Sequence, residues 1–204
     1  MKKYFTISKI TQIAILSALA IVLYNFPKFP LPFFPGMLKV QFSMLPTLIG
    51  GFVLGPIGGV IICVIKFVFK LLTTQSAGVG EIMDLAIGIA VILVSSIIYY
   101  KKQTNKSVIF ALIAGVVVWT GLGVLLNGVY AIPAYSNQFG LDAVLGMLKI
   151  IPGVDDSNYI QKYLIYGCLP FNLMLSTIVS VVTYFVYKKV KLLFNMMDNK
   201  LENK

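Results

Sequence analysis

The sequence predicts an all-α, polytopic membrane protein with six transmembrane helices and with both termini in the cytoplasm. Of its 204 residues, 58% are hydrophobic and only 12% are charged, which is too apolar a balance for a soluble domain of this size. Several apolar stretches reach the roughly 20 residues that a helix needs to cross a bilayer core of about 30 Å, with at most one or two ionisable groups inside them. Lysines gather at the ends of these stretches. We therefore expect a single membrane domain over residues 1–204.

The six expected spans follow the apolar stretches in chain order. The second and third spans share one long apolar stretch, and the glycines around Gly55-Pro56 break this stretch near its middle. Two short helices joined by a tight turn accommodate that stretch. We place the spans at about 7–26, 40–54, 57–72, 81–100, 107–132 and 163–187.

The positive charge predicts the orientation of the chain. The formal charge of +10 comes from lysine alone, because the sequence contains no arginine. These lysines bracket hydrophobic segments instead of forming a basic face, so they indicate topology and not nucleic-acid binding. The positive-inside rule then places the loops 27–39, 73–80 and 133–162 outside, which implies a substrate site open to the outer face. The clusters that set this orientation are Lys2, Lys3 and Lys9, then Lys101, Lys102 and Lys106, then Lys188, Lys189 and Lys191.

The residue inventory excludes several kinds of chemistry. No phosphate loop of the form Gly-x-x-x-x-Gly-Lys-Ser/Thr is present, so the chain cannot hold a nucleoside triphosphate in that way. There is also no histidine, the commonest general base and transition-metal ligand. We expect no catalytic residue, no metal and no cofactor. Paired carboxylates remain at Glu81 and Asp84 and at Asp155 and Asp156, of which the second pair is typical of a solvated turn.

Ionisable residues within the predicted spans are candidates for function, because burying them in hydrocarbon costs several kcal/mol unless they are paired or hydrated. Lys66 and Lys70 are four residues apart and share one helix face; we expect Lys70 to extend to the outer interface. Glu81 and Asp84 follow Gly80 in the first turn of the fourth span, beneath an outer loop. They could bind a ligand, or they could simply favour the helix dipole.

Two asparagines lie near the outer ends of the last two spans. Asn127 stands in the segment that continues to Tyr130, and Asn172 follows Pro170. An amide carries both donors and acceptors, so the two asparagine side chains could form hydrogen bonds with the edge of a heterocycle on which C=O and N–H groups alternate. Hydrogen bonding between helices is the alternative explanation.

Two further segments have both a functional and a structural explanation. The aromatic, proline-rich segment Phe26–Gly36 could cover a flat aromatic ligand, or could form an interfacial aromatic belt. Ala14 and Ala18 form a small-residue face on the first span, on which another protein could dock; internal packing explains the same spacing.

Together these features resemble the riboflavin-specific substrate-binding (S) components of energy-coupling factor (ECF) transporters. The resemblance extends over most of the chain. It implies a six-helix protein of the bacterial cell membrane that captures riboflavin from the outer face and partners a transmembrane coupling protein and two ATPase subunits. The motifs that carry it are Ala14-x-x-x-Ala18, Phe33-x-Pro35, Phe42-Ser43-x-x-Pro46-x-Leu48-Ile49-Gly50, Gly55-Pro56, Ile65-Lys66, Gly78-Val79-Gly80-Glu81, Gly88, the Asn127 region and Pro170-Phe171-Asn172.

The sequence also departs from this family at four positions. Members commonly have an acidic residue in place of Met44, asparagines in place of Phe67 and Asp84, and a lysine in place of Leu175. The missing lysine should have helped to hold the polar end of the flavin ring. A related flavin, or a site arranged differently around Lys39 or Lys66, is therefore an open alternative.

We predict a riboflavin-binding subunit that depends on partner subunits for ATP-driven transport. An S component for another vitamin or a nucleobase-like solute, or a small membrane enzyme using Glu81 and Asp84, are the alternatives. The resemblance implies that Ala14 and Ala18 face the coupling protein and that Asn127 and Asn172 contact the flavin. In our leading hypothesis the segment Phe33–Leu38 encloses the ring, while Glu81, Asp84 and loop backbone serve the ribityl hydroxyls. The candidate substrate-binding residues are Phe33, Met37, Leu38, Lys39, Gly80, Glu81, Asp84, Asn127, Tyr130, Asn172 and Leu175.

Overall fold

The computed structural model describes residues 6–74 and 77–202, and nearly all of its regular structure is helical. Lys2 and Lys3, which contributed to the predicted orientation, lie outside the described residues. The elements are α1 (Ile7–Asn25), β1 (Phe29–Pro30), β2 (Lys39–Val40), α2 (Met44–Leu54), α3 (Pro56–Leu72), α4 (Val79–Lys102), α5 (Asn105–Leu126), the π-helix η1 (Asn127–Ala131), α6 (Ile132–Phe139), α7 (Leu141–Leu148), α8 (Tyr159–Lys162), the π-helix η2 (Tyr163–Cys168) and α9 (Leu169–Glu202).

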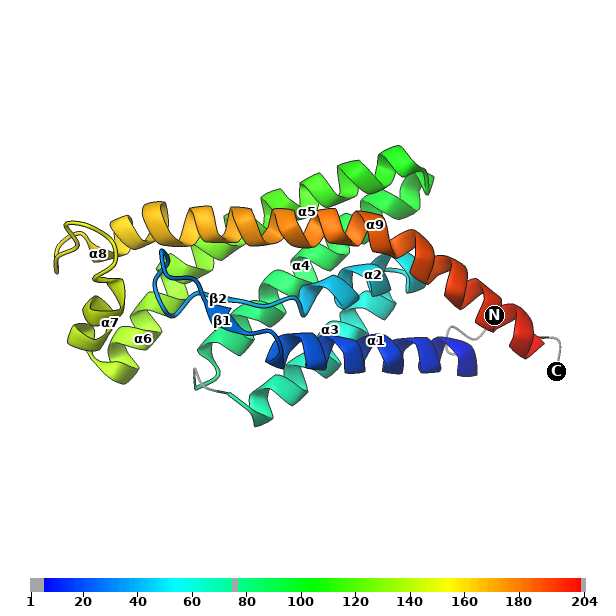
Figure 1. The fold of residues 1–204 in the computed structure, drawn as a ribbon, viewed down its shortest axis with the longest axis horizontal. Helices are drawn as coiled ribbons and strands as arrows, with labels where there is room; N and C mark the ends of the chain where they lie inside the picture. The colour runs from blue at the N-terminus through cyan, green and yellow to red at the C-terminus, as the bar shows by residue number, and fades with distance from the viewer. Residues whose placement is uncertain (1–5, 75–76, 203–204) are drawn as a thin grey trace.

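The long helices lie alongside one another and give the molecule an elongated shape (Figure 1). The start of α1, the turn between α4 and α5 and the end of α9 lie at one end of the molecule, at the right of Figure 1. The hairpin β1–β2 and the short helices α6, α7 and α8 lie toward the other end. We call these the terminal end and the hairpin end.

Within the described residues, four continuous helical segments are long and apolar enough to cross a membrane, judged by length and composition: 7–25, 79–102, 105–139 and 159–199. The chain is thus all-α with several membrane-capable helices. Helix α2 is apolar but has only 11 residues, and α3 has 17. The six-span count and the cytoplasmic termini stay predictions.

Local signals set the helix boundaries. The hydroxyl of Thr6 accepts a hydrogen bond from the backbone N–H of Lys9 and caps α1, and Thr104 caps α5 in the same way. The predicted break in the long apolar stretch occurs at Gly55, whose φ of 91° suits glycine. Pro56 then opens α3, at the helix start where a missing N–H costs no hydrogen bond.

Helices α2 and α3 pack very closely. A Cβ atom on Gly59 would lie 2.8 Å from the Cα of Gly51, so neither position leaves room for a side chain. This close contact lets two short helices fold back on each other and pack against α4.

The outer segment 133–162 differs from the loop that we predicted. Helix α5 continues through η1 into α6, and α7 and α8 follow. Pro133 lies in the first turn of α6, where the helix tolerates proline, and Gly140 (φ 86°) makes the corner into α7. Prolines and glycines that we had assigned to a loop therefore begin and end short helices.

The aromatic, proline-rich segment forms a hairpin. Strands β1 and β2 pair antiparallel, with Phe29 opposite Val40 and Pro30 opposite Lys39. Residues 31–38 form the loop of this hairpin, and we call them the flap. Helix α9 also extends past the predicted end of the sixth span at 187.

Candidate functional site

A cavity of about 610 Å³ lies at the hairpin end of the molecule. Its walls come from the end of α1, the flap, the starts of α2 and α4, the end of α3, the region from α5 to α7, and the start of α9. Residues far apart in the sequence therefore meet around one space, on the side where the sequence predicts outward loops.

Nine of the eleven predicted substrate-binding residues line this cavity. Phe33 and Tyr130, both in the described part of the chain, are not among the lining residues; 69% of Phe33 and 37% of Tyr130 is exposed. The nine that line it are Met37, Leu38, Lys39, Gly80, Glu81, Asp84, Asn127, Asn172 and Leu175.

In the flap, Phe34 is the aromatic residue that points toward the protein interior. Its ring packs edge to face on Phe171 of α9, with centroids 5.4 Å apart, whereas the Phe33 ring packs on Phe34 and is largely exposed. This contact ties the flap to the first turn of α9. Sequence reasoning could not separate the two adjacent phenylalanines, because only the turn geometry of the flap decides which one points inward.

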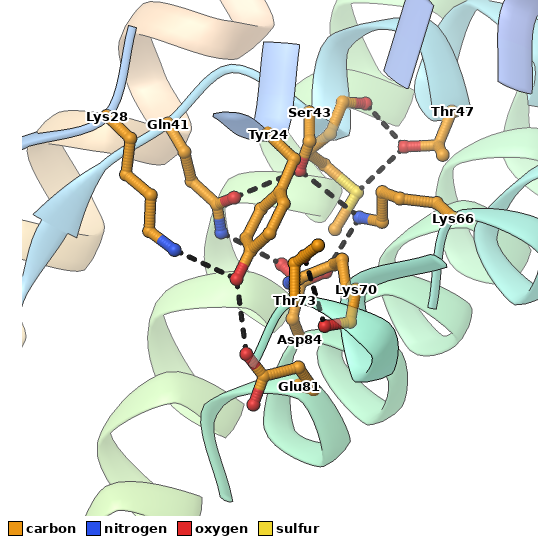
Figure 2. Close-up of polar contacts among 11 residues, drawn as sticks. Tyr24, Lys28, Gln41, Ser43, Thr47, Lys66, Lys70, Thr73, Glu81 and Asp84 are labelled. Carbon is orange, nitrogen blue, oxygen red and sulfur yellow. Dashed lines mark hydrogen bonds and ion pairs between the residues drawn. The ribbon is translucent and has the colours of Figure 1, made fainter. Parts of the chain in front are cut away.

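A buried ion cluster lies beside the cavity, centred on Asp84 (Figure 2). The ammonium groups of Lys66 and Lys70 lie 2.7 Å and 2.9 Å from Oδ2 of Asp84. Both lysines are buried, so the expectation that Lys70 extends to the outer interface is wrong. The physical reason is that α3 packs against α4, which brings a carboxylate within reach of both lysines.

Tyr24 lies between two ammonium groups next to this cluster. The Nζ atoms of Lys28 and Lys70 lie 4.1 Å and 4.2 Å from its ring centroid, which are cation–π distances. The Tyr24 hydroxyl donates to Glu81 at 3.1 Å and accepts from Lys28 at 2.9 Å (Figure 2). Burial lowers the pKa of Lys28, and the charges of Lys39 and Lys70 lower it further.

The side chain of Gln41 completes the polar wall. Its Nε2 donates to Asp84 at 3.3 Å, and its Oε1 accepts from Ser43, whose hydroxyl in turn accepts from Lys66. Sequence reasoning missed Tyr24, Lys28 and Gln41. Lys28 lies in the predicted outer loop 27–39 and Gln41 lies next to the start of the predicted second span, so both are polar residues that flank the flap; this position was the available signal.

The two asparagines lie on the other side of the site, in or next to the π-helical segments. Asn127 donates from Nδ2 to the Gly123 carbonyl at 2.7 Å and accepts from the Tyr163 hydroxyl at 2.7 Å. Asn172 donates from Nδ2 to the Cys168 carbonyl at 2.9 Å. Most of their bonds are therefore within their own helical segments, and the bond from Tyr163 joins η2 to η1. π-Helical turns of this kind are frequent at functional sites.

Aromatic and sulfur-containing side chains provide most of the remaining wall. Sequence reasoning missed them because an aromatic residue inside an apolar run has the same pattern whether it packs, faces lipid or lines a cavity. The residues of this group that line the cavity are Met44, Met83, Trp119, Tyr135, Phe139, Met147, Tyr163 and Phe171.

Ala14 and Ala18 lie away from the cavity on α1. Both are exposed, while Ser17 between them is buried. Packing inside this chain therefore does not explain the small-residue spacing.

The arrangement favours binding over catalysis. Asp84 is held by two lysines, and Glu81 is hydrogen-bonded to Tyr24. Neither carboxylate is placed as a proton acceptor for a substrate. Among the described residues, no three His, Cys, Asp or Glu side chains are grouped closely enough to hold a metal ion.

Comparison with known proteins identifies what this fold and site are similar to. The family model "ECF transporter, substrate-specific component" matches residues 8–187. The chain is 31% identical to a Staphylococcus aureus protein named riboflavin transporter RibU, over 89% of both chains. It is 29% identical to a Bacillus subtilis protein named riboflavin transporter FmnP, over 91% of this chain and 93% of that protein.

A solved structure shows the same fold. It is described as the S component of a bacterial ECF transporter, and its TM-score against this chain is 0.66 at 30% sequence identity. The match covers 89% of this chain and 94% of the solved chain.

Proposed function

The chain belongs to the family of substrate-specific components of ECF transporters, and from this premise we propose that it binds riboflavin in the cavity at the hairpin end. It is a transporter component and not an enzyme, because the relatives it matches are transporters. Riboflavin is thus its transported ligand and not a cofactor.

The observation that carries the proposal is the distribution of polarity around the cavity. A volume of about 610 Å³ suits a small-molecule ligand. Aromatic side chains such as Trp119 and Phe171 can pack on a flat tricyclic ring, and the amides of Asn127 and Asn172 can bond its polar edge. The wall of lysines and carboxylates provides partners for the hydroxyls of a ribityl chain.

The proposed binding set has three parts. Met37, Leu38 and Leu175 pack on the ring. Asn127 and Asn172 form hydrogen bonds with its polar edge, and a third group of residues binds the ribityl chain. Leu175, in the place of a lysine common in the family, contributes apolar surface instead of charge. Residues that would serve the ribityl chain are Lys39, Gly80, Glu81 and Asp84.

We also propose how the chain is placed in the bacterial cell membrane. Helices α1 to α4, the α5–α6 unit and α9 form six spans, with the terminal end in the cytoplasm and the flap outside. Support comes from Lys101, Lys102, Lys188 and Lys189, which belong to the segments at the terminal end. A transmembrane coupling protein and two ATPase subunits supply the energy.

Riboflavin titration tests the function directly. Trp119 is the only tryptophan of the chain and lines the cavity, so its emission reports occupancy without a label. Micromolar riboflavin should quench the emission of the purified protein with saturation, and should itself lose fluorescence. A protein whose tryptophan emission does not respond to riboflavin would contradict the proposal.

The exposed alanine face gives a prediction about assembly. Ala18→Phe should leave riboflavin affinity unchanged, because the side chain is exposed and does not line the cavity, but should weaken co-purification with the coupling protein and the ATPases. Ala86→Phe, at an exposed position on α4, is the matched control. Equal co-purification of both variants would remove Ala18 from the interface.

A further inference from the structure

We propose that Tyr163 is a positioning residue that fixes which atoms of Asn127 face the ligand, and that Asn127 and Asn172 act as an ordered donor and acceptor. The inference rests on the proposed riboflavin site and deepens it. It assigns a role to a fully buried tyrosine and a polarity to each amide.

Two backbone carbonyls set the orientation of the amides. A carbonyl oxygen only accepts hydrogen bonds, so the atom of Asn127 that lies 2.7 Å from the Gly123 oxygen must be the nitrogen. The same holds for Asn172, whose nitrogen lies 2.9 Å from the Cys168 oxygen. Reversing either amide would place two oxygens in contact.

Tyr163 holds the other end of the Asn127 amide. Its hydroxyl donates to Oδ1 at 2.7 Å, and its side chain is fully buried in the segment η2. A single bond to Gly123 would leave the amide plane able to turn. A second bond from the facing segment fixes that plane, because the Tyr163 ring cannot move without displacing its packing.

The bonds already made decide what each amide has left for a ligand. Asn127 uses one of its two N–H groups on Gly123 and one of its two Oδ1 lone pairs on Tyr163, so it retains one N–H donor beside an oxygen that already has a partner. Asn172 directs Nδ2 to the oxygen and the sulfur of Cys168, at 2.9 Å and 3.2 Å. In the part of the chain that the structure describes, no hydrogen bond reaches its Oδ1, which is a free acceptor.

A donor from Asn127 and an acceptor from Asn172 fit a ligand edge on which a ring C=O stands beside a ring N–H. The imide edge of the flavin pyrimidine ring has this order. Both asparagines are nearly buried and line the cavity, and both approach Gly123, so the two groups can act on one edge. Tyr163 therefore affects how strongly the Asn127 N–H bonds the ring carbonyl of the ligand, although Tyr163 does not itself bond that carbonyl.

The experiment compares ligands on the variant Tyr163→Phe, which keeps the ring and removes only the hydroxyl. The probes are riboflavin, its 2-thio and 4-thio analogues, in which a carbonyl becomes a poor acceptor, and N3-methylriboflavin, which lacks the ring N–H. Affinities come from quenching of Trp119 emission. Tyr166→Phe, in the same segment but 64% exposed, is the control.

Wild-type protein should prefer riboflavin over one of the two thio analogues by about fivefold, the size of one hydrogen bond to a neutral group. Tyr163→Phe should weaken riboflavin binding by about fivefold and reduce that preference to less than about twofold. The penalty for N3-methylriboflavin should stay as in wild type, since it depends on Asn172. Tyr166→Phe should behave as wild type throughout.

Three results would overturn the inference: an unchanged riboflavin affinity in Tyr163→Phe, an equal loss for every ligand, or no thio preference in wild type. An equal loss would indicate a general loosening of the cavity. Wild-type protein that binds none of these flavins would instead overturn the proposed function itself. The two failures are therefore distinguishable.

Discussion

Asp84→Ala should destabilise the protein by about 3–5 kcal/mol, because it leaves two buried ammonium groups without their carboxylate. Lys66 is fully buried and Lys70 is 3% exposed, so neither ammonium group is hydrated as it would be at the surface. The measurement is the midpoint and the half-life of thermal unfolding in detergent, followed by circular dichroism. The variant should unfold at a clearly lower temperature than the wild type.

Two further variants distinguish the loss of stability caused by breaking this ion cluster from a general effect of removing a carboxylate. Asp142→Ala changes an exposed carboxylate on α7 and should leave the midpoint unchanged. The triple variant Lys66→Met, Lys70→Met and Asp84→Ala removes the charges together and should recover much of the loss, since apolar residues often replace a buried ion network at little cost. A midpoint for Asp84→Ala equal to that of Asp142→Ala would show that the cluster is hydrated and weak.

The sequence predicts the long helices well and the hairpin end poorly. A run of about 20 apolar residues is a strong signal, and the turn at Gly55-Pro56 lies where the glycines and the proline place it. Helices α6 and α7 have eight residues each and carry proline or glycine at their ends. Such features are typical of loops as well, so the pattern in 133–162 could not distinguish the two.

Within the site, the sequence predicts the polar residues better than the aromatic ones. Asn127, Asn172 and Asp84 are polar groups in apolar spans, and this contrast singles them out. Trp119 and Tyr163 have no such contrast, because aromatic residues are common throughout the chain. The pairing of Lys70 with Asp84 depended on which faces of α3 and α4 meet, and helix period alone does not determine this.

The family resemblance is the observation that relates the separate sequence motifs to one another. Its motifs are spread from the first span to the start of the last, and the family match covers the same length of chain, residues 8–187. Each motif could arise by chance, but their order along the chain could not easily do so. Met44, Asp84 and Leu175, three of the four positions at which we expect this chain to depart from the family, all lie on the cavity wall.

Gly123→Ala should weaken riboflavin binding by roughly 10- to 100-fold, the effect expected when a buried polar group loses its ligand partner. A Cβ atom at this position would lie 2.9 Å from both Cγ and Oδ1 of Asn172 and 3.2 Å from its Nδ2. These distances are too short, so the amide must move, and it is held on its other side by Cys168. The measurement is the dissociation constant from quenching of Trp119 emission.

Gly121→Ala is the matched control for this prediction. It lies on the same helix, and the Cβ that it would add has no atom within 4 Å apart from the backbone of its own helix and its chain neighbours. Alanine favours helix over glycine by up to about 1 kcal/mol, and both variants should share this gain in stability. A loss of affinity confined to Gly123→Ala would therefore come from the displaced Asn172 amide. Equal affinities in both variants would show that the Oδ1 acceptor of Asn172 does not contribute to binding, and Asn127 would then be the amide that bonds the polar edge of the ligand.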